Sequence, residues 1–91
     1  MARNDVKSID KFIEKFPASG TATIRFDAAP ENGEPYIQVQ AKQADERILT
    51  YTHEMKEASH EVVKRQASEL VKKLDAAEIK HDPITDDTPK T

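Results

Sequence analysis

HEMKEASHEVVKRQASELVKKL, residues 53–74, is the stretch that decides most of the fold of this chain. Apolar residues recur in it at steps of three and four, which is the spacing of one face of an α-helix. The residues that carry this spacing are Val63, Ala67, Leu70 and Leu74, and Ala77 continues it just beyond the stretch. Glu61 and Glu69 precede basic residues by three and four positions, an order that favours ion pairs along a helix. The pattern predicts a long amphipathic helix from about Glu54 to Ala77.

Three segments before this helix are typical of β-strands. Residues 20–27 (GTATIRFD) and 35–42 (PYIQVQAK) alternate between apolar and polar residues, which is the period of a strand covered on one face only. Residues 47–53 (RILTYTH) are rich in β-branched and aromatic side chains, which favour a third strand. In this third segment the pattern leaves open whether Ile48 or the pair Leu49/Tyr51 faces the core.

The two ends of the chain differ in character. Residues 4–17 (NDVKSIDKFIEKFP) predict a first helix that Asn4 or Asp5 caps and that Pro17 ends. The apolar residues at helical spacing in this segment are Val6, Ile9, Phe12, Ile13 and Phe16. Residues 79–91 contain two prolines and three aspartates, and we expect them to form a disordered tail.

These elements predict an α+β fold: a two-layer α-β-β-β-α domain whose three-stranded antiparallel sheet carries both helices on one face. Asn32-Gly33 predicts a hairpin turn between the first two strands, because both residues tolerate positive φ. The expected boundaries are residues 1–4 as an N-terminal extension, residues 5–78 as a single domain and residues 79–91 as the tail.

Composition narrows the classes of function. The 91 residues include no cysteine, and 17 acidic residues against 14 basic ones give a net charge of −3. A domain that binds phosphate backbones usually has a clear basic excess. No apolar run approaches the roughly 20 residues of a membrane span, and MARNDVKS lacks the apolar core of a signal peptide. We therefore expect a soluble, cytoplasmic protein that does not bind membranes.

Two strings resemble the double-stranded RNA-binding domain. APENGEPYIQVQ (29–40) occupies the place of that family's first loop and second strand, and KEASHEVVKRQASEL (56–70) the place of its last helix. The resemblance covers roughly Asp5 to Leu74. It implies a helix beside a three-stranded antiparallel meander, with a second helix that follows the sheet.

The family's RNA-contact motifs are largely missing from this sequence. Where the family has Gly-Pro-x-His, the chain has Ala29, Pro30, Glu31 and Asn32, and one lysine, Lys56, stands where the family has a lysine cluster. Each lost phosphate contact removes about one released counterion's worth of affinity. Duplex RNA or DNA binding is therefore the alternative function, and weak binding is expected. Its candidate residues are Asn32, Lys56, Lys64, Arg65, Lys72 and Lys73.

The leading hypothesis is a small non-enzymatic protein-interaction module. The polar face of the predicted sheet carries Tyr and Arg side chains, which bring a large contact area at a small cost in side-chain entropy. The candidate residues on this face are Arg25, Tyr36, Gln38 and Gln40. An exposed edge strand could also pair with a partner's sheet or with a second copy of this chain. Small acidic chains without cysteine are frequent among phage and mobile-element accessory proteins and inhibitors, which is an analogy only.

No cofactor, metal site or catalytic site is expected. His53, Glu57, His60 and Glu61 share a helical neighbourhood, but structural zinc sites show a fuller set of cysteine and histidine ligands. The sequence contains no glycine-rich phosphate loop and no nucleophile elbow. We therefore predict that the protein is not an enzyme.

Overall fold

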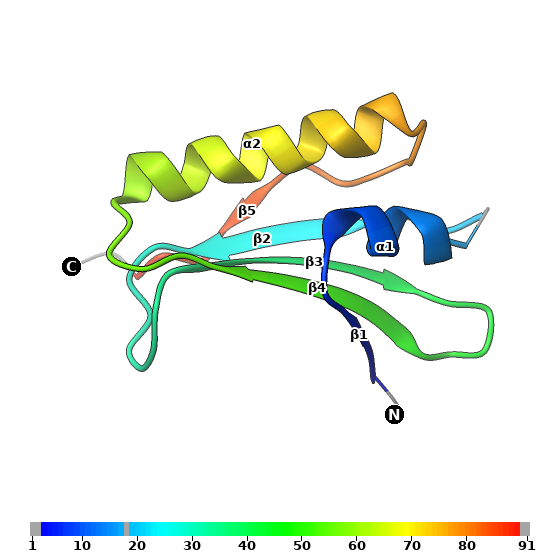
Figure 1. Cartoon of the computed structure of the whole chain (residues 1–91), viewed down its shortest axis with the longest axis horizontal. Helices are drawn as coiled ribbons and strands as arrows, with labels where there is room; N and C mark the ends of the chain where they lie inside the picture. The colour runs from blue at the N-terminus through cyan, green and yellow to red at the C-terminus, as the bar shows by residue number, and fades with distance from the viewer. Residues whose placement is uncertain (1–2, 18, 90–91) are drawn as a thin grey trace.

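The computed structural model describes residues 3–17 and 19–89 of the chain (Figure 1). Two helices and five strands follow one another as β1 (Arg3–Val6), α1 (Ile9–Lys15), β2 (Thr23–Asp27), β3 (Tyr36–Lys42), β4 (Ile48–Glu54), α2 (His60–Ala76) and β5 (Thr85–Asp86).

The strands form one mixed five-stranded sheet in the order β1-β4-β3-β2-β5. The central strands β2, β3 and β4 pair antiparallel, as the alternation predicts. β1 pairs parallel with β4, and β5 pairs parallel with β2. The prediction of a three-stranded antiparallel sheet is therefore wrong. Periodicity finds strands that are long enough to alternate, and the two outer strands have only four and two residues.

β1 comes from residues that were expected to be an extension and the start of a helix. The chain leaves β1 at Val6 and enters α1 through Ser8, whose extended backbone and side chain make it the N-cap. The Ser8 Oγ accepts a hydrogen bond from the Lys11 N–H at 3.1 Å. The prediction that Asn4 or Asp5 caps this helix is wrong, because these two residues pair with β4 instead.

α2 begins later than the sequence pattern indicates. The chain leaves β4 at Glu54, passes through a turn in which Glu57 has a φ of 51°, and reaches the N-cap Ser59. The Ser59 Oγ accepts from the Val62 N–H at 3.3 Å. The charged residues of this turn are compatible with a helix, so composition alone could not place its start.

The segment after α2 is ordered through residue 89 and closes one edge of the sheet. Ile79 is only 8% exposed and belongs to the hydrophobic core. The Asp82 N–H donates to the Ala22 carbonyl at 3.0 Å, and the Asp87 N–H donates to the Phe26 carbonyl at 2.8 Å. These bonds occupy one carbonyl of β2 and the carbonyl of the residue just before it, which would otherwise be unpaired. The expected disordered tail is therefore wrong for residues 79–89; residues 90–91 lie outside the described part.

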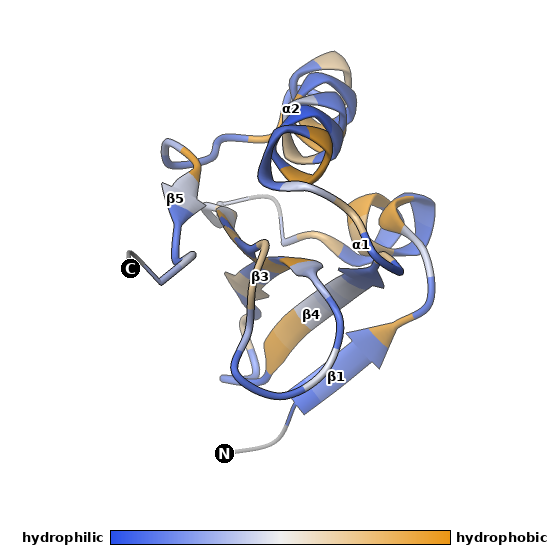
Figure 2. Cartoon of the chain, turned by 90° about the vertical axis from the view of Figure 1, so that its left-hand side faces the viewer, coloured by the Kyte–Doolittle hydropathy of each residue, from blue (hydrophilic) through white to orange (hydrophobic). Residues whose placement is uncertain are grey.

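Both helices lie on the same side of the sheet (Figures 1 and 2). α1 packs against β4 and β1, and α2 packs against β2 and β3. Leu49 and Tyr51 of β4 are buried in the core, which settles the inward face of that strand. The largest side chains with almost no exposure are Phe12, Phe26, Ile24, Ile37, Leu49, Leu74, Val39 and Val63. Within the described residues no helix covers the opposite face of the sheet, called the outer face below.

Candidate functional site

A shallow hollow of about 480 Å³ lies on the outer face, where β1, β4 and β3 meet the loop between β2 and β3. Its lining residues are Arg3, Asp5, Val6, Asn32, Glu34, Tyr36, Gln38, Thr52 and Glu54. Three segments distant in sequence therefore contribute to one concave surface: β1, the β2–β3 loop together with β3, and β4.

Strand register sets the floor of the hollow. Tyr36 of β3 lies opposite Glu54 of β4, and Gln38 lies opposite Thr52. Because paired residues of antiparallel strands point to the same face, these four side chains stand next to one another. Tyr36 and Gln38 are half-buried, whereas Thr52 and Glu54 are exposed. The floor thus combines one aromatic ring, two neutral hydrogen-bonding groups and one carboxylate.

The lining of the hollow is acidic as a whole. Three carboxylates, those of Asp5, Glu34 and Glu54, line it against the single guanidinium of Arg3. Arg3 already pairs with Asp5 at 2.9 Å along the same strand. One Glu34 carboxylate oxygen lies 3.4 Å from the Glu57 N–H, which donates to it. Glu34 and Glu54 therefore give the side of the hollow next to Tyr36 an excess of negative charge.

The four residues predicted for protein binding all belong to the outer face, but only two of them line the hollow. Tyr36 and Gln38 are in its floor. Arg25 of β2 lies beside Gln38 in the strand register and pairs with Asp87 at 3.6 Å. The Gln40 Nε2 donates to the Thr50 Oγ1 at 3.3 Å, and Thr50 is fully buried although it lies on the open side. The Gln40 side chain thus also satisfies the buried hydroxyl of Thr50.

The residues predicted for nucleic-acid binding are spread over separate parts of the molecule. Asn32 lines the hollow, whereas Lys56 lies in the turn before α2. Four more, Lys64, Arg65, Lys72 and Lys73, lie on α2 and are exposed. Arg65 lies 3.8 Å from Glu61 and Lys72 lies 3.2 Å from Glu69. Asn32 and the basic side chains of the helix therefore do not share the hollow.

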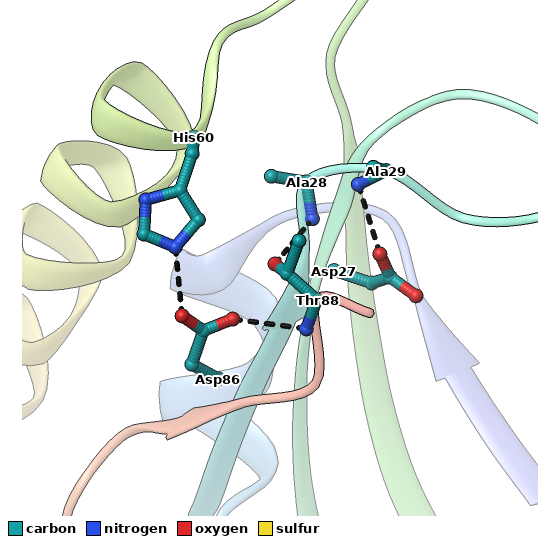
Figure 3. A network of polar contacts seen from close by, with 6 residues as sticks. All are labelled: Asp27, Ala28, Ala29, His60, Asp86 and Thr88. Atoms are coloured by element: carbon teal, nitrogen blue, oxygen red, sulfur yellow. Dashed lines mark hydrogen bonds and ion pairs between the residues drawn. The ribbon is translucent and has the colours of Figure 1, made fainter. Parts of the chain in front are cut away.

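A second polar cluster anchors the C-terminal segment to α2 and β2 (Figure 3). The His60 Nε2 lies 2.7 Å from the Asp86 Oδ2, and the Asp86 Oδ1 accepts from the Thr88 N–H at 2.9 Å. The Thr88 Oγ1 in turn accepts from the Ala28 N–H at 3.0 Å. The hydrogen bonds from His60 and Thr88 lower the pKa of Asp86 to about 2. Sequence reasoning missed this cluster, because it requires a folded tail.

The remaining histidines also have protein partners. The His81 Nδ1 lies 3.1 Å from the Asp82 carbonyl and its Nε2 2.7 Å from the Asp75 Oδ1; these two contacts raise the pKa of His81, although burial opposes them. The His53 Nδ1 lies 3.1 Å from the Tyr51 hydroxyl, whose pKa is raised by burial. Within residues 3–17 and 19–89, no group of three or more histidine, cysteine or acidic side chains is arranged to hold a metal ion.

Comparison of the chain with protein-family models, with curated proteins and with solved structures gives no match. The candidate site therefore rests on its own geometry. Among the described residues, no helix has the length and apolar content needed to cross a lipid bilayer.

Proposed function

We propose that the protein is a non-enzymatic interaction module whose outer sheet face binds an exposed basic segment of another protein. The feature that carries this proposal is the hollow, which Tyr36, Glu34 and Glu54 line together, with Glu54 opposite Tyr36 in the strand register. An arginine side chain of the partner fits this hollow best, because its planar guanidinium both stacks on aromatic rings and binds carboxylates.

The charges around the hollow favour a cation over an anion. Among the lining residues, three carboxylates outnumber one arginine, and that arginine is already paired with Asp5. Hydrogen bonds between a guanidinium and carboxylates are about twice as strong as neutral ones. A phosphate group at this position would instead be repelled. The outer face therefore supports binding of a basic protein segment better than binding of a duplex.

The rest of the outer face extends the contact beyond one side chain. Gln38 and Thr52 offer both donors and acceptors next to the ring, so the main chain of an extended segment can be paired there. Arg25 stands farther along the same face, at 51% side-chain exposure, and can meet a carboxylate or carbonyl of the partner. In this proposal Tyr36, Gln38 and Arg25 contact the partner, whereas Gln40 donates a hydrogen bond to Thr50 of the same sheet.

The test is a titration of the isotope-labelled chain with the peptide Gly-Ser-Arg-Ser-Gly, blocked at both ends, followed by the amide signals in two-dimensional NMR spectra. We expect shifts at Tyr36, Gln38, Thr52 and Glu54 with a dissociation constant of about 1 mM, which is reasonable for one anchoring side chain. The same peptide with citrulline in place of arginine keeps the shape and removes the charge. Equal shifts from both peptides, or shifts confined to α2, would contradict the proposal.

Two single-residue variants test whether the carboxylate of Glu54 binds the arginine of the peptide. Glu54→Gln should weaken peptide binding about fivefold, because a hydrogen bond to a charged group contributes about 1 kcal/mol more than a neutral one. Glu61→Gln is the matched control: it removes the same charge from an exposed position on α2 and should leave binding unchanged. A parallel mobility-shift titration with duplex RNA at two salt concentrations tests the alternative. Submicromolar, salt-sensitive binding there would favour the duplex over the protein segment.

A further inference from the structure

The two edges of the sheet differ in whether a following segment of the chain covers them. On the β2 side, residues 80–88 run along the strand and contain Pro83, which has no N–H to donate to a further strand. On the other side, β1 is the outermost strand of the described sheet and pairs only with β4. An edge of this kind presents unpaired N–H and carbonyl groups and is a template for another strand.

The residues of β1 are complementary to a second copy of themselves. Arg3 and Asp5 both point to the outer face and pair with each other at 2.9 Å. If two copies of β1 pair antiparallel about Asn4, Arg3 of each copy stands opposite Asp5 of the other. The four charges then form a square in which every neighbour has the opposite sign. Opposite charges directly across two strands are stabilising, and like charges are destabilising.

Symmetry selects this antiparallel register. A two-fold axis through Asn4 relates two β1 strands in opposite directions and closes the assembly at two copies. A parallel, in-register pairing would instead place Arg3 opposite Arg3 and Asp5 opposite Asp5, with like charges facing each other. The charge pattern therefore specifies both the direction and the offset of the pairing.

We propose that the chain forms a two-fold symmetric dimer through antiparallel pairing of β1 with β1 of a second copy, so that the two sheets become one continuous sheet. This inference does not depend on the proposed partner. It does bear on the hollow, because Arg3 and Asp5 line it. The second copy's β1 then borders each hollow, and the two hollows lie on the same face on either side of the axis.

The experiment is sedimentation velocity of the full chain over concentrations from about 10 µM to 1 mM, since a short strand edge is a small interface with a dissociation constant on the order of 100 µM. We expect a reversible monomer–dimer equilibrium. Arg3→Glu should raise the dissociation constant about tenfold, because symmetry places two like-charged pairs across the seam. The charge swap Arg3→Glu with Asp5→Arg should restore it to within about twofold of the unmodified chain.

Lys11→Glu provides the matched control. Lys11 pairs with Glu14 on α1 with exposure similar to that of Arg3, so this variant makes the same charge change away from the seam and should leave the equilibrium unchanged. Circular dichroism melts confirm that each variant folds. A chain that stays monomeric throughout the range overturns the proposal. So does an Arg3→Glu variant that associates as strongly as the unmodified chain, or a charge swap that fails to recover association although it melts normally.

Discussion

Replacing Ile79 by alanine tests whether the segment after α2 is part of the folded core. Ile79 is 8% exposed, belongs to the core cluster and donates its N–H to the Leu74 carbonyl at 2.9 Å. The substitution keeps the backbone hydrogen bond and removes buried apolar atoms. A tail that is disordered would lose nothing from this change, so the variant separates the two descriptions of the segment.

The expected cost follows from the surroundings of the side chain. Truncating a buried isoleucine to alanine costs about 2–5 kcal/mol, and the cost depends on how well the site can collapse or fill with water. Ile79 borders an open hollow of about 360 Å³ that Ile13 and Phe16 also line, so its cavity is not sealed. We therefore expect the low end, about 2–3 kcal/mol, of a total stability of roughly 5–14 kcal/mol for a chain of this length.

Urea denaturation followed by circular dichroism measures this loss. With a slope of about 1–1.5 kcal/mol per molar urea, the midpoint should fall by about 2 M. Val62→Ala is the control, because Val62 is 37% exposed on α2 and should change stability by about 0.5 kcal/mol or less. A midpoint for the Ile79 variant equal to that of the control would refute the packing of this segment.

Two further outcomes are expected from single residues. The raised pKa of His81, ordinarily 6.5, means that its stabilising effect is complete below pH 6.5 and is lost as the pH rises through the raised value. Thermal melts of His81→Gln from about pH 5 to 9 should therefore lack part of the pH dependence of the unmodified chain, and identical slopes would contradict this. Gly33 has a φ of +97° with no atom within 4 Å of an added Cβ, so Gly33→Ala should cost about 1–2 kcal/mol from backbone strain alone. A neutral or stabilising effect in urea titrations would show that the loop relaxes.

Much of the central fold could be predicted from the sequence. The alternation in residues 20–27 and 35–42 and the composition of residues 47–53 found the three central strands, because each is long enough to show its pattern. The helical spacing from Val63 to Leu74 found the buried face of α2. These signals are local, and the central antiparallel strands need only short connections to meet.

The outer strands β1 and β5 could not be predicted in the same way, because they are strands only through their pairing with β4 and β2. Asn4 and Asp5 are equally compatible with a helix cap. They form a strand because they pair with the edge of β4. Thr85 and Asp86 are both exposed and show no alternation. The available signals were the two isoleucines of the last segment: Ile79 is buried in the core, and Ile84 packs against it.

The candidate site was found only in part for the same reason. Alternation placed Arg25, Tyr36, Gln38 and Gln40 on one face of the sheet, and the strand register places them there. The hollow around Tyr36, however, needs Arg3 and Asp5 from β1 and the loop that carries Glu34. Glu34 lies two residues before Tyr36, but Arg3 and Asp5 reach the hollow only through the nonlocal pairing of β1 with β4. The sequence patterns therefore could not show the complete lining of the hollow.

The pairing of β5 with β2 has a consequence for how the protein folds during synthesis. β2 is made early, yet the residues that close its edge follow α2 in the chain. A ribosome adds about 5–20 residues each second, so β2, β3 and β4 spend several seconds with that edge open. We expect chains that stop before residue 80 to bind chaperones or to aggregate through this edge. Pairing of residues 80–88 with β2, once they have left the ribosome, ends that exposure.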